Sequence, residues 1–389
     1  MLTLTILCML QAPAATDTLT LADALQRAYA ARPQIRAVAA SMARARATLR
    51  VAGQLPNPML EFQADQQAPT RKAVLTQPLN WLVRRGADRG VARALAARDA
   101  ADSTQQLATL VRDVRVSYFT AVAAGARLTL VAEQAGLADT LAAIAEQRLG
   151  AGDISVLERD QAAQEAGRLA LLRSTAREDA AIASVLLSRA IGASDPVVIP
   201  VVLPPLPDAA PEPGAVPPPR VRMAQAEAEA ARERATVASR AALPVPSLIT
   251  GLDWAGQAQG GRNLIVGALM PVPLWQQNGG ARAEARAARD VAAAVAGEVA
   301  LEVNAQIAAT RIRLTEAMYR ARTAEATLAP AARQLRAGTV RLYDAGRVGL
   351  LPVLDALRAE RDVQLTALAA SLAAHVAAAD LQALLGDDR

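Results

Sequence analysis

Few side chains in this sequence have the types and spacing that chemistry requires. His375 is the only histidine and stands between Ala374 and Val376 in an Ala-rich segment, and Cys8 is the only cysteine. A single imidazole without cysteines or clustered carboxylates does not make a metal site. The sequence also lacks a Gly-rich phosphate loop and a nucleophile paired with a base. We therefore expect no enzymatic activity, no metal, no cofactor, and a helix-packing role for His375.

The sequence contains two copies of one unit, offset by about 194 residues. The segment 148–157 (RLGAGDISVL) reappears as 342–351 (LYDAGRVGLL), with Gly152 aligned with Gly346. A period of this length indicates a duplicated fold, not the short repeat of a solenoid.

The duplication divides the chain into a first repeat (16–195), a Pro-rich linker (196–219) and a second repeat (220–389). Residues 1–15 precede the first repeat and have the apolar stretch and small residues of a secretory signal, although the usual positive start is missing. Cleavage would remove Cys8, so the mature chain would contain no thiol.

Composition excludes several classes of protein. The chain is 52% hydrophobic but only 2% aromatic, and much of its apolar content is Ala, which favours close helix packing. The net charge is +5, and the basic residues are mostly Arg spread along helices beside Glu and Asp. This pattern is typical of a solvated helix face, so we expect no nucleic-acid partner. No later stretch of 18 uncharged apolar residues occurs, so we also expect no transmembrane helix.

Each repeat contains one β-hairpin, at 58–79 and 247–271. Leu60 and Phe62 alternate with polar residues in the first, and Leu248 and Leu252 do so in the second. Each strand is about nine residues, the length that a tilted strand needs to cross a bilayer.

The three tryptophans favour the membrane interpretation. Trp81, Trp254 and Trp275 lie at strand ends, where an interfacial aromatic belt would place them. The alternative is a soluble protein in which two hairpins pack on a helical bundle.

Four strands cannot close a membrane barrel, and an open sheet edge in lipid leaves backbone groups without partners. The chain must therefore oligomerise if the strands span a membrane. Two copies would give eight strands and three would give twelve. Because eight-stranded barrels are filled by side chains, a conducting pore favours three copies.

Long helices are expected at 87–149 and 156–191, and again at 281–341 and 350–385. The first would be about 90 Å long, and a seven-residue seam through Val111, Val114, Tyr118 and Ala121 suits coiled packing. Breakers at matching places, Gly136 and Pro330, predict a kink or interruption in each copy. A soluble coiled-coil scaffold would explain these helices, but not the strands.

Five short segments together resemble one known family. They are LTLADAL at 19–25, LPNP at 55–58, QPL at 77–79, RLYDAG at 341–346 and VLDA at 353–356. In this order and spacing the chain resembles the TolC-type outer-membrane efflux proteins over nearly its whole mature length. The LPNP and QPL pieces look most like the branch of heavy-metal efflux channels of the CzcC type.

The resemblance implies a mainly α fold with a membrane β-barrel, in which a homotrimer contributes four strands per chain to twelve. The helices would form a long periplasmic tube below the outer membrane. The partners would be outer-membrane lipid, a periplasmic adaptor (membrane fusion) protein and an inner-membrane pump of the RND type. The function would be the channel of a tripartite efflux system for small molecules or metal ions. A type I protein-secretion duct of the same fold and a soluble periplasmic scaffold remain alternatives.

The resemblance implies that residues 150–155 and 344–349 are the turns of two helical hairpins. These turns would contact the adaptor. Gly152 and Gly346 suit reversals of the chain because Gly tolerates positive φ. Ser155 and Gly349 close the same turns.

By resemblance, Asp355 and Tyr343 belong to the channel entrance. Asp355 matches the second of two entrance aspartates, and Pro352 replaces the first. Tyr343 matches a Tyr that helps to hold the entrance closed. We hypothesise that three copies of Asp355 form a ring that favours cations. The alternative is that Asp355 only caps or forms a salt bridge on its helix.

The remaining entrance residues depart from the family pattern. Val348 stands where the family has a gating Arg, and the adjacent Arg347 would point elsewhere. In the first repeat, Glu158 matches an acidic partner of that Arg, and Asp153 is a further carboxylate nearby.

Overall fold

The computed structural model describes residues 18–64, 71–194, 197–207, 209–212, 214–254, 261–272, 274–275 and 277–387. The predicted signal segment with Cys8, and most of the turns predicted at 66–71 and 256–262, lie outside the described residues. The chain forms two compact units. The strand unit comprises 36–106 and 214–305, and the hairpin unit comprises 1–35, 107–213 and 306–389.

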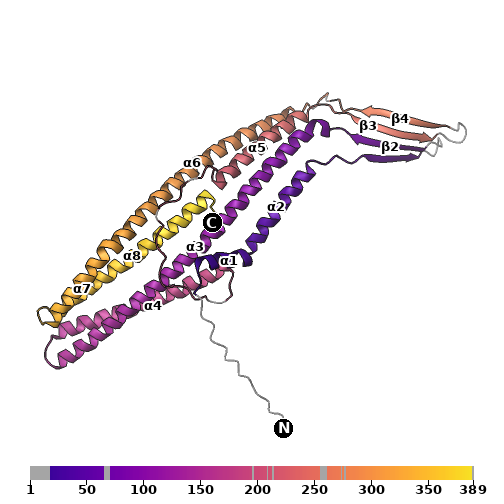
Figure 1. Cartoon of the computed structure of the whole chain (residues 1–389). Coiled ribbons are helices and arrows are strands. Elements are labelled where there is room, and N and C mark those ends of the chain that lie inside the picture. Colours follow the sequence, from indigo (N-terminus) through magenta and orange to yellow (C-terminus); the bar gives the residue numbers. More distant parts are fainter. Residues whose placement is uncertain are drawn as a thin grey trace, which may run out of the picture. The chain divides into compact units, whose positions relative to one another are not determined.

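Most of the described chain is helical (Figure 1). The helices are α1 (Leu21–Ala31), α2 (Pro33–Val51), α3 (Trp81–Gly150), α4 (Val156–Ile191), α5 (Pro219–Arg240), α6 (Gly279–Thr323), a π-helical turn (Ala324–Leu328), α7 (Ala329–Asp344) and α8 (Leu350–Leu385). The strands are β1 (Met59–Ala64), β2 (Arg71–Pro78), β3 (Ser247–Trp254) and β4 (Arg262–Leu269).

The two predicted helix breakers have different outcomes. Helix α3 runs for 70 residues, about 105 Å, and is not interrupted at Gly136, so of the predicted kink or interruption only the kink stays a prediction. Gly weakens a helix but keeps its backbone N–H, and the ladder of hydrogen bonds can continue. Pro330 is the second residue of α7, which begins at the end of the π-helical turn. The proline ring has no N–H and collides with the preceding turn, and one wider turn relieves both problems, so this prediction is confirmed.

The expectation of no membrane-length helix was too strong. Helices α3 and α8, and the stretch Gly279–Asp344, are long and apolar enough to cross a membrane by length and composition.

The four strands form one antiparallel sheet in the order β1-β2-β3-β4 (Figure 1). Leu75 of β2 is paired with Leu60 of β1 and with Thr250 of β3, so the hairpins of the two repeats join side by side. Strand β1 has six residues and the others have eight, slightly fewer than the nine expected. Strands β1 and β4 form the two edges of this sheet.

The hairpin unit has a core between the middle of α3 and the end of α4. Val114, Tyr118 and Val122 of α3 pack with Leu187 and Ile191 of α4. The predicted seam on α3 is therefore buried over this part.

The linker packs on the same unit without regular structure in its described residues. Val197, Ile199 and Leu203 contact the core. His375 of α8 stacks on Phe119, with ring centroids 4.3 Å apart, and its Nε2 lies 3.1 Å from the carbonyl oxygen of Pro204. The predicted packing role of His375 is confirmed.

The duplication extends to the helix ends. Gly192 ends α4 and Gly386 ends α8, both with positive φ (73° and 77°). In each case the next residue donates its N–H to the carbonyl five residues back, at 2.9 Å. These Schellman motifs repeat at the sequence offset of the two copies.

Candidate functional site at the hairpin ends and the sheet

The two predicted turns have the same backbone. Gly152 and Gly346 have φ of 80° and 65°. The N–H of Asp153 bonds to the carbonyl of Arg148, and that of Arg347 to Leu342, both at 2.9 Å. Both turns are Schellman motifs, in which only Gly adopts the required φ without strain. The turn prediction is confirmed for both repeats.

The helices that follow these turns begin differently. The Ser155 hydroxyl accepts a hydrogen bond from the Glu158 N–H at 3.2 Å, and the Glu158 carboxylate accepts one from the Ser155 N–H at 3.1 Å. This capping box satisfies two N–H groups that a helix start leaves unpaired. Gly349, the equivalent residue before α8, offers no side-chain cap.

Glu158 also lies against the start of α8, which lacks a side-chain cap. A Cβ placed on Gly349 would lie 3.1 Å from Glu158 Oε1, so the carboxylate lies directly against this turn. The N–H of Ser155 is the main reason that the pKa of Glu158 lies below its usual value, and the N–H of Leu350 lowers this pKa further. Glu158 of the first repeat therefore joins the starts of α4 and α8.

Tyr343 has a partner that the sequence analysis did not identify. The Arg148 guanidinium donates a 2.7 Å hydrogen bond to the Tyr343 hydroxyl and lies 5.2 Å from the centroid of its ring. Both residues line a groove of about 510 Å³ between α3, α7 and α8. Leu350 and Leu354 of α8 pack beside them with Ala145 of α3 and Ala162 of α4. The helical hairpin α3–α4 therefore contacts the helical hairpin α7–α8 at the ends that carry the two turns.

Asp355 is exposed and paired on its own helix. Arg358 donates to Asp355 Oδ1 at 3.1 Å, and the Asp355 side chain is 61% exposed. The same guanidinium donates two hydrogen bonds, of 3.0 and 2.9 Å, to Glu165 of α4. The intrahelical salt bridge that was the alternative role for Asp355 is therefore present, and the ring hypothesis stays a prediction.

Glu165 forms the centre of a buried ionic cluster between α4 and α8. Arg361 donates to its second oxygen at 2.9 Å, and these two side chains are only 5% and 6% exposed. Burial raises the pKa of Glu165, but hydrogen bonds from Arg358 and Arg361 outweigh it and hold this pKa below its ordinary value. The residue before Arg361, Glu360, is also buried and pairs with Arg336 of α7 at 2.8 Å.

The other predicted entrance residues lie on the surface. Asp153 and Arg347 are both exposed in the turns. Within the described part of the chain Arg347 forms no ion pair, and its direction away from a closing contact stays a prediction. Asp153 is near enough to Arg148 to favour the charged form of that guanidinium.

Sequence reasoning missed Arg148 and Glu165. Arg148 opens the repeated segment, but its counterpart is Leu342, so the duplication gave no reason to assign it a role. Glu165 lies seven residues after Glu158 and therefore on the same face of α4. The available signal was a second charged residue on the same face of this Ala-rich helix as Glu158.

The sheet of the strand unit has two different faces. On the apolar face, neighbouring strands align two rows of mostly apolar residues: Leu60–Leu75–Thr250–Val266 and Phe62–Ala73–Leu252–Leu264. The opposite face is more polar and is called the polar face here: it carries the row Gln63–Lys72–Asp253–Asn263, with Lys72 and Asp253 3.7 Å apart. It is not uniformly polar, because the next row is Glu61–Val74–Gly251–Ile265. Phe62 is 75% and Leu264 73% exposed on the apolar face.

The tryptophans lie near both ends of the strands, although only one belongs to a strand. Trp254 is the last residue of β3. Trp81 is instead the first residue of α3, where Arg85 lies 5.9 Å from its ring centroid. Trp275 follows β4 and is 93% exposed.

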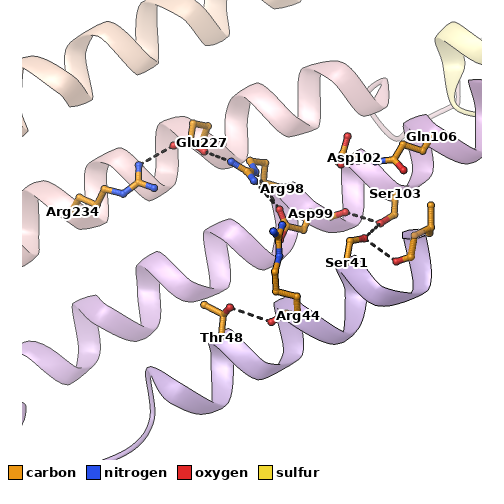
Figure 2. A network of polar contacts seen from close by, with 11 residues as sticks. Ser41, Arg44, Thr48, Arg98, Asp99, Asp102, Ser103, Gln106, Glu227 and Arg234 are labelled. Carbon is orange, nitrogen blue, oxygen red and sulfur yellow. Dashed lines mark hydrogen bonds and ion pairs between the residues drawn. The ribbon is translucent and has the colours of Figure 1, made fainter. Parts of the chain in front are cut away.

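An ionic network joins the helices that lead into the sheet (Figure 2). Asp99 of α3 pairs with Arg44 of α2 at 3.3 Å and with the neighbouring Arg98 at 3.0 Å. Arg98 also pairs with Glu227 of α5 at 3.3 Å, and Arg234 pairs with the same carboxylate at 2.8 Å. Because α2 precedes β1, α3 follows β2 and α5 precedes β3, this network holds together the helices that carry three of the four strands.

No protein-family model matches this sequence, and no curated protein matches it. Solved structures do match. A membrane protein from Pseudomonas aeruginosa has a TM-score of 0.81 and 18% identity, covering 95% of this chain and 91% of that one. CusC, whose structures describe folding and transmembrane channel formation, has a TM-score of 0.78 and 18% identity, covering 95% and 92%. The CmeC outer membrane channel of Campylobacter jejuni has a TM-score of 0.79 and 14% identity, covering 95% and 86%. The chain has the fold of these proteins.

Proposed function

We propose that this chain is the outer-membrane channel of a tripartite efflux system. The observation that carries the proposal is the sheet, which has a mostly apolar face, a second face that is more polar, and two open edges. An exposed apolar face is suited to lipid, and a polar face to a water-filled interior.

The open edges of β1 and β4 require neighbours. In hydrocarbon, each unpaired backbone group costs several kcal/mol, so four strands alone are unstable there. Pairing β4 of one subunit with β1 of the next closes the wall. Three copies supply twelve strands and leave room for a pore, and we propose this homotrimer.

The helices form the periplasmic part in this proposal. The hairpin ends with Gly152, Ser155, Gly346 and Gly349 contact a periplasmic adaptor protein, and an inner-membrane pump of the RND type supplies substrate and energy. The channel itself performs no chemistry. Its cargo is a class of small molecules or metal ions, and the heavy-metal branch stays a prediction from the LPNP and QPL segments.

The direct test is to express the chain with its leader, fractionate the cell and extract the outer membrane with detergent. We expect a trimer by light scattering and stepwise ion conductance in a planar bilayer. A species recovered without detergent would favour the soluble periplasmic scaffold. A stable detergent-bound monomer without conductance would contradict the proposal.

A protein-secretion duct of the same fold would pass the same test. Co-purification separates the two alternatives, because a type I secretion system would bring an ATP-driven pump in place of an RND pump.

A further inference from the structure

One end of the apolar face differs in charge from the rest. The row after Phe62–Ala73–Leu252–Leu264 is Ala64–Arg71–Trp254–Arg262. Arg71 is the direct partner of Trp254, and Trp254 of Arg262. Direct partners in an antiparallel sheet have side chains on one face, with Cβ atoms about 5 Å apart. Two arginines therefore flank one tryptophan on this face, at the end of the sheet remote from the helices of the strand unit (Figure 1).

Arg71 and Arg262 differ from the neighbouring Lys72 in their ion pairing. Arg71 and Arg262 are exposed, and within the described part of the chain neither forms an ion pair. Lys72, on the polar face, is paired with Asp253. Among the described residues at this end, the positive charge without an ion-pair partner thus belongs to the apolar face.

The opposite end of the same face has a different character. Its row is Gln77–Leu248–Ala268, which carries no charge. A solubilising role would be needed equally at both ends, and the basic row occurs only at the loop end.

A hollow adjoins the basic row. It has a volume of about 530 Å³ and is lined by Phe62, Ala64, Arg71 and Trp254, and at its other side by Gln63 and Lys72 of the polar face. Arg262 is not part of this lining and enters the site as the direct strand partner of Trp254. The hollow therefore offers aromatic surface and a guanidinium together, beside the apolar rows. This combination suits a ligand with an anionic head and an apolar tail. Arg binds phosphate in a bidentate manner, and Trp favours the boundary between lipid and water.

We propose that Arg71, Trp254 and Arg262 bind the phosphate of a lipid headgroup in the membrane leaflet at the loop end of the sheet. The acyl chains then lie on the rows of Phe62 and Leu60. This inference rests on the proposed function, because it requires the apolar face to contact a bilayer.

The test uses the detergent-solubilised full chain and counts bound lipid by native mass spectrometry. The probes are phosphatidic acid, diacylglycerol with the same acyl chains, and glycerol phosphate. We expect phosphatidic acid to bind tightest. In the R71Q/R262Q variant its affinity should fall on the order of tenfold, since each basic side chain near a lipid surface contributes appreciably. Binding of diacylglycerol should not change.

Two further variants separate specific recognition from net charge and from misfolding. R286Q/R313Q removes two exposed positive charges from helix α6 and should leave lipid binding as in the wild type. R71K/R262K keeps both charges without the bidentate geometry and should give intermediate affinity.

Equal binding of phosphatidic acid by wild type and R71Q/R262Q would overturn the inference, as would an equal loss in R286Q/R313Q. Glycerol phosphate binding as tightly as phosphatidic acid would identify a site for soluble anions instead. Oligomer mass and conductance are measured on the same samples. A conducting trimer without lipid preference refutes only this inference, whereas a wild type that neither assembles nor conducts refutes the proposed function.

Discussion

The Arg148 guanidinium donates a 2.7 Å hydrogen bond to the Tyr343 hydroxyl, and so connects the last turn of α3 with the last turn of α7. These residues are 195 positions apart and belong to different repeats. The bond connects the helical hairpin α3–α4 with the helical hairpin α7–α8 at the ends where the proposed channel would narrow.

We expect Tyr343→Phe to increase the resting conductance of the reconstituted channel. The change removes the hydrogen bond but keeps the ring beneath Arg148. Loss of one such bond should shift the balance between closed and open ends by roughly twofold to fivefold per subunit. Tyr319→Phe is the matched control, because Tyr319 is 67% exposed on α6. If both variants conduct like the wild type, this pair does not hold the ends closed.

Glu158 should protect the start of α8 as well as that of α4. In Glu158→Ala, we expect faster amide hydrogen exchange at Leu350 together with the first turn of α4. Ser155→Ala removes only the hydroxyl of the capping box, so its effect should stay within α4. Hydrogen exchange read by mass spectrometry measures both helices at once. Unchanged exchange at Leu350 in Glu158→Ala would show that α8 needs no help from the first repeat.

The parts of the fold that depend on local pattern could be predicted from the sequence. Alternation around Leu60 and Phe62 indicated strands, and the φ requirement of Gly152 and Gly346 located both turns. The duplication predicted one β-hairpin in each repeat, and in the structure these two β-hairpins lie side by side in one sheet.

The parts that depend on side chains meeting across the fold could not be predicted in this way. The contact of Arg148 with Tyr343 and the ionic cluster of Glu165 depend on how the hairpins pack. Gly136 does not interrupt α3 for another reason: a helix packed along much of its length tolerates the modest intrinsic cost of one glycine.

The ionic cluster around Glu165 should make the pairing of α4 and α8 sensitive to acid. Glu165→Gln leaves Arg361 buried without its carboxylate and should destabilise the protein by about 3 kcal/mol at neutral pH. The pKa of Glu165 is lowered in the folded protein from a value of 4.5, so the stabilising effect is complete above pH 4.5. It is lost as the pH falls through the folded pKa.

Thermal unfolding followed by circular dichroism at several pH values measures this difference. The gap between wild type and Glu165→Gln should shrink below pH 4.5. Glu178→Gln, an exposed position on the same helix, should match the wild type throughout. A gap that is constant with pH would mean that the charge of Glu165 is not what stabilises the pairing.

Asp355 should contribute to ion selectivity although it pairs with Arg358. An exposed ion pair is weak, and Arg358 is also held by Glu165, so the carboxylate can still attract cations. We expect Asp355→Asn to reduce the preference for cations over anions and to weaken block by trivalent cations in single-channel recordings. Asp153→Asn removes an exposed carboxylate from the other turn and is the comparison. Equal selectivity in wild type and Asp355→Asn would leave only the salt bridge as the role of Asp355.

Adjacent residues of β4 should respond in opposite ways to the same substitution, because they lie on different faces of the sheet. Leu264 is on the apolar face and Asn263 on the polar face. Leu264→Arg places a charge against hydrocarbon one row inside the basic row, and it should cost about 1–2 kcal/mol, between the values for the interface and the middle of the bilayer. Asn263→Arg adds the same charge to the water-filled interior and should be tolerated. The fraction of chain recovered as membrane-inserted trimer reports this difference directly. Equal recovery of the two variants would mean that the apolar face does not contact lipid, because no soluble environment distinguishes two exposed neighbours in this way.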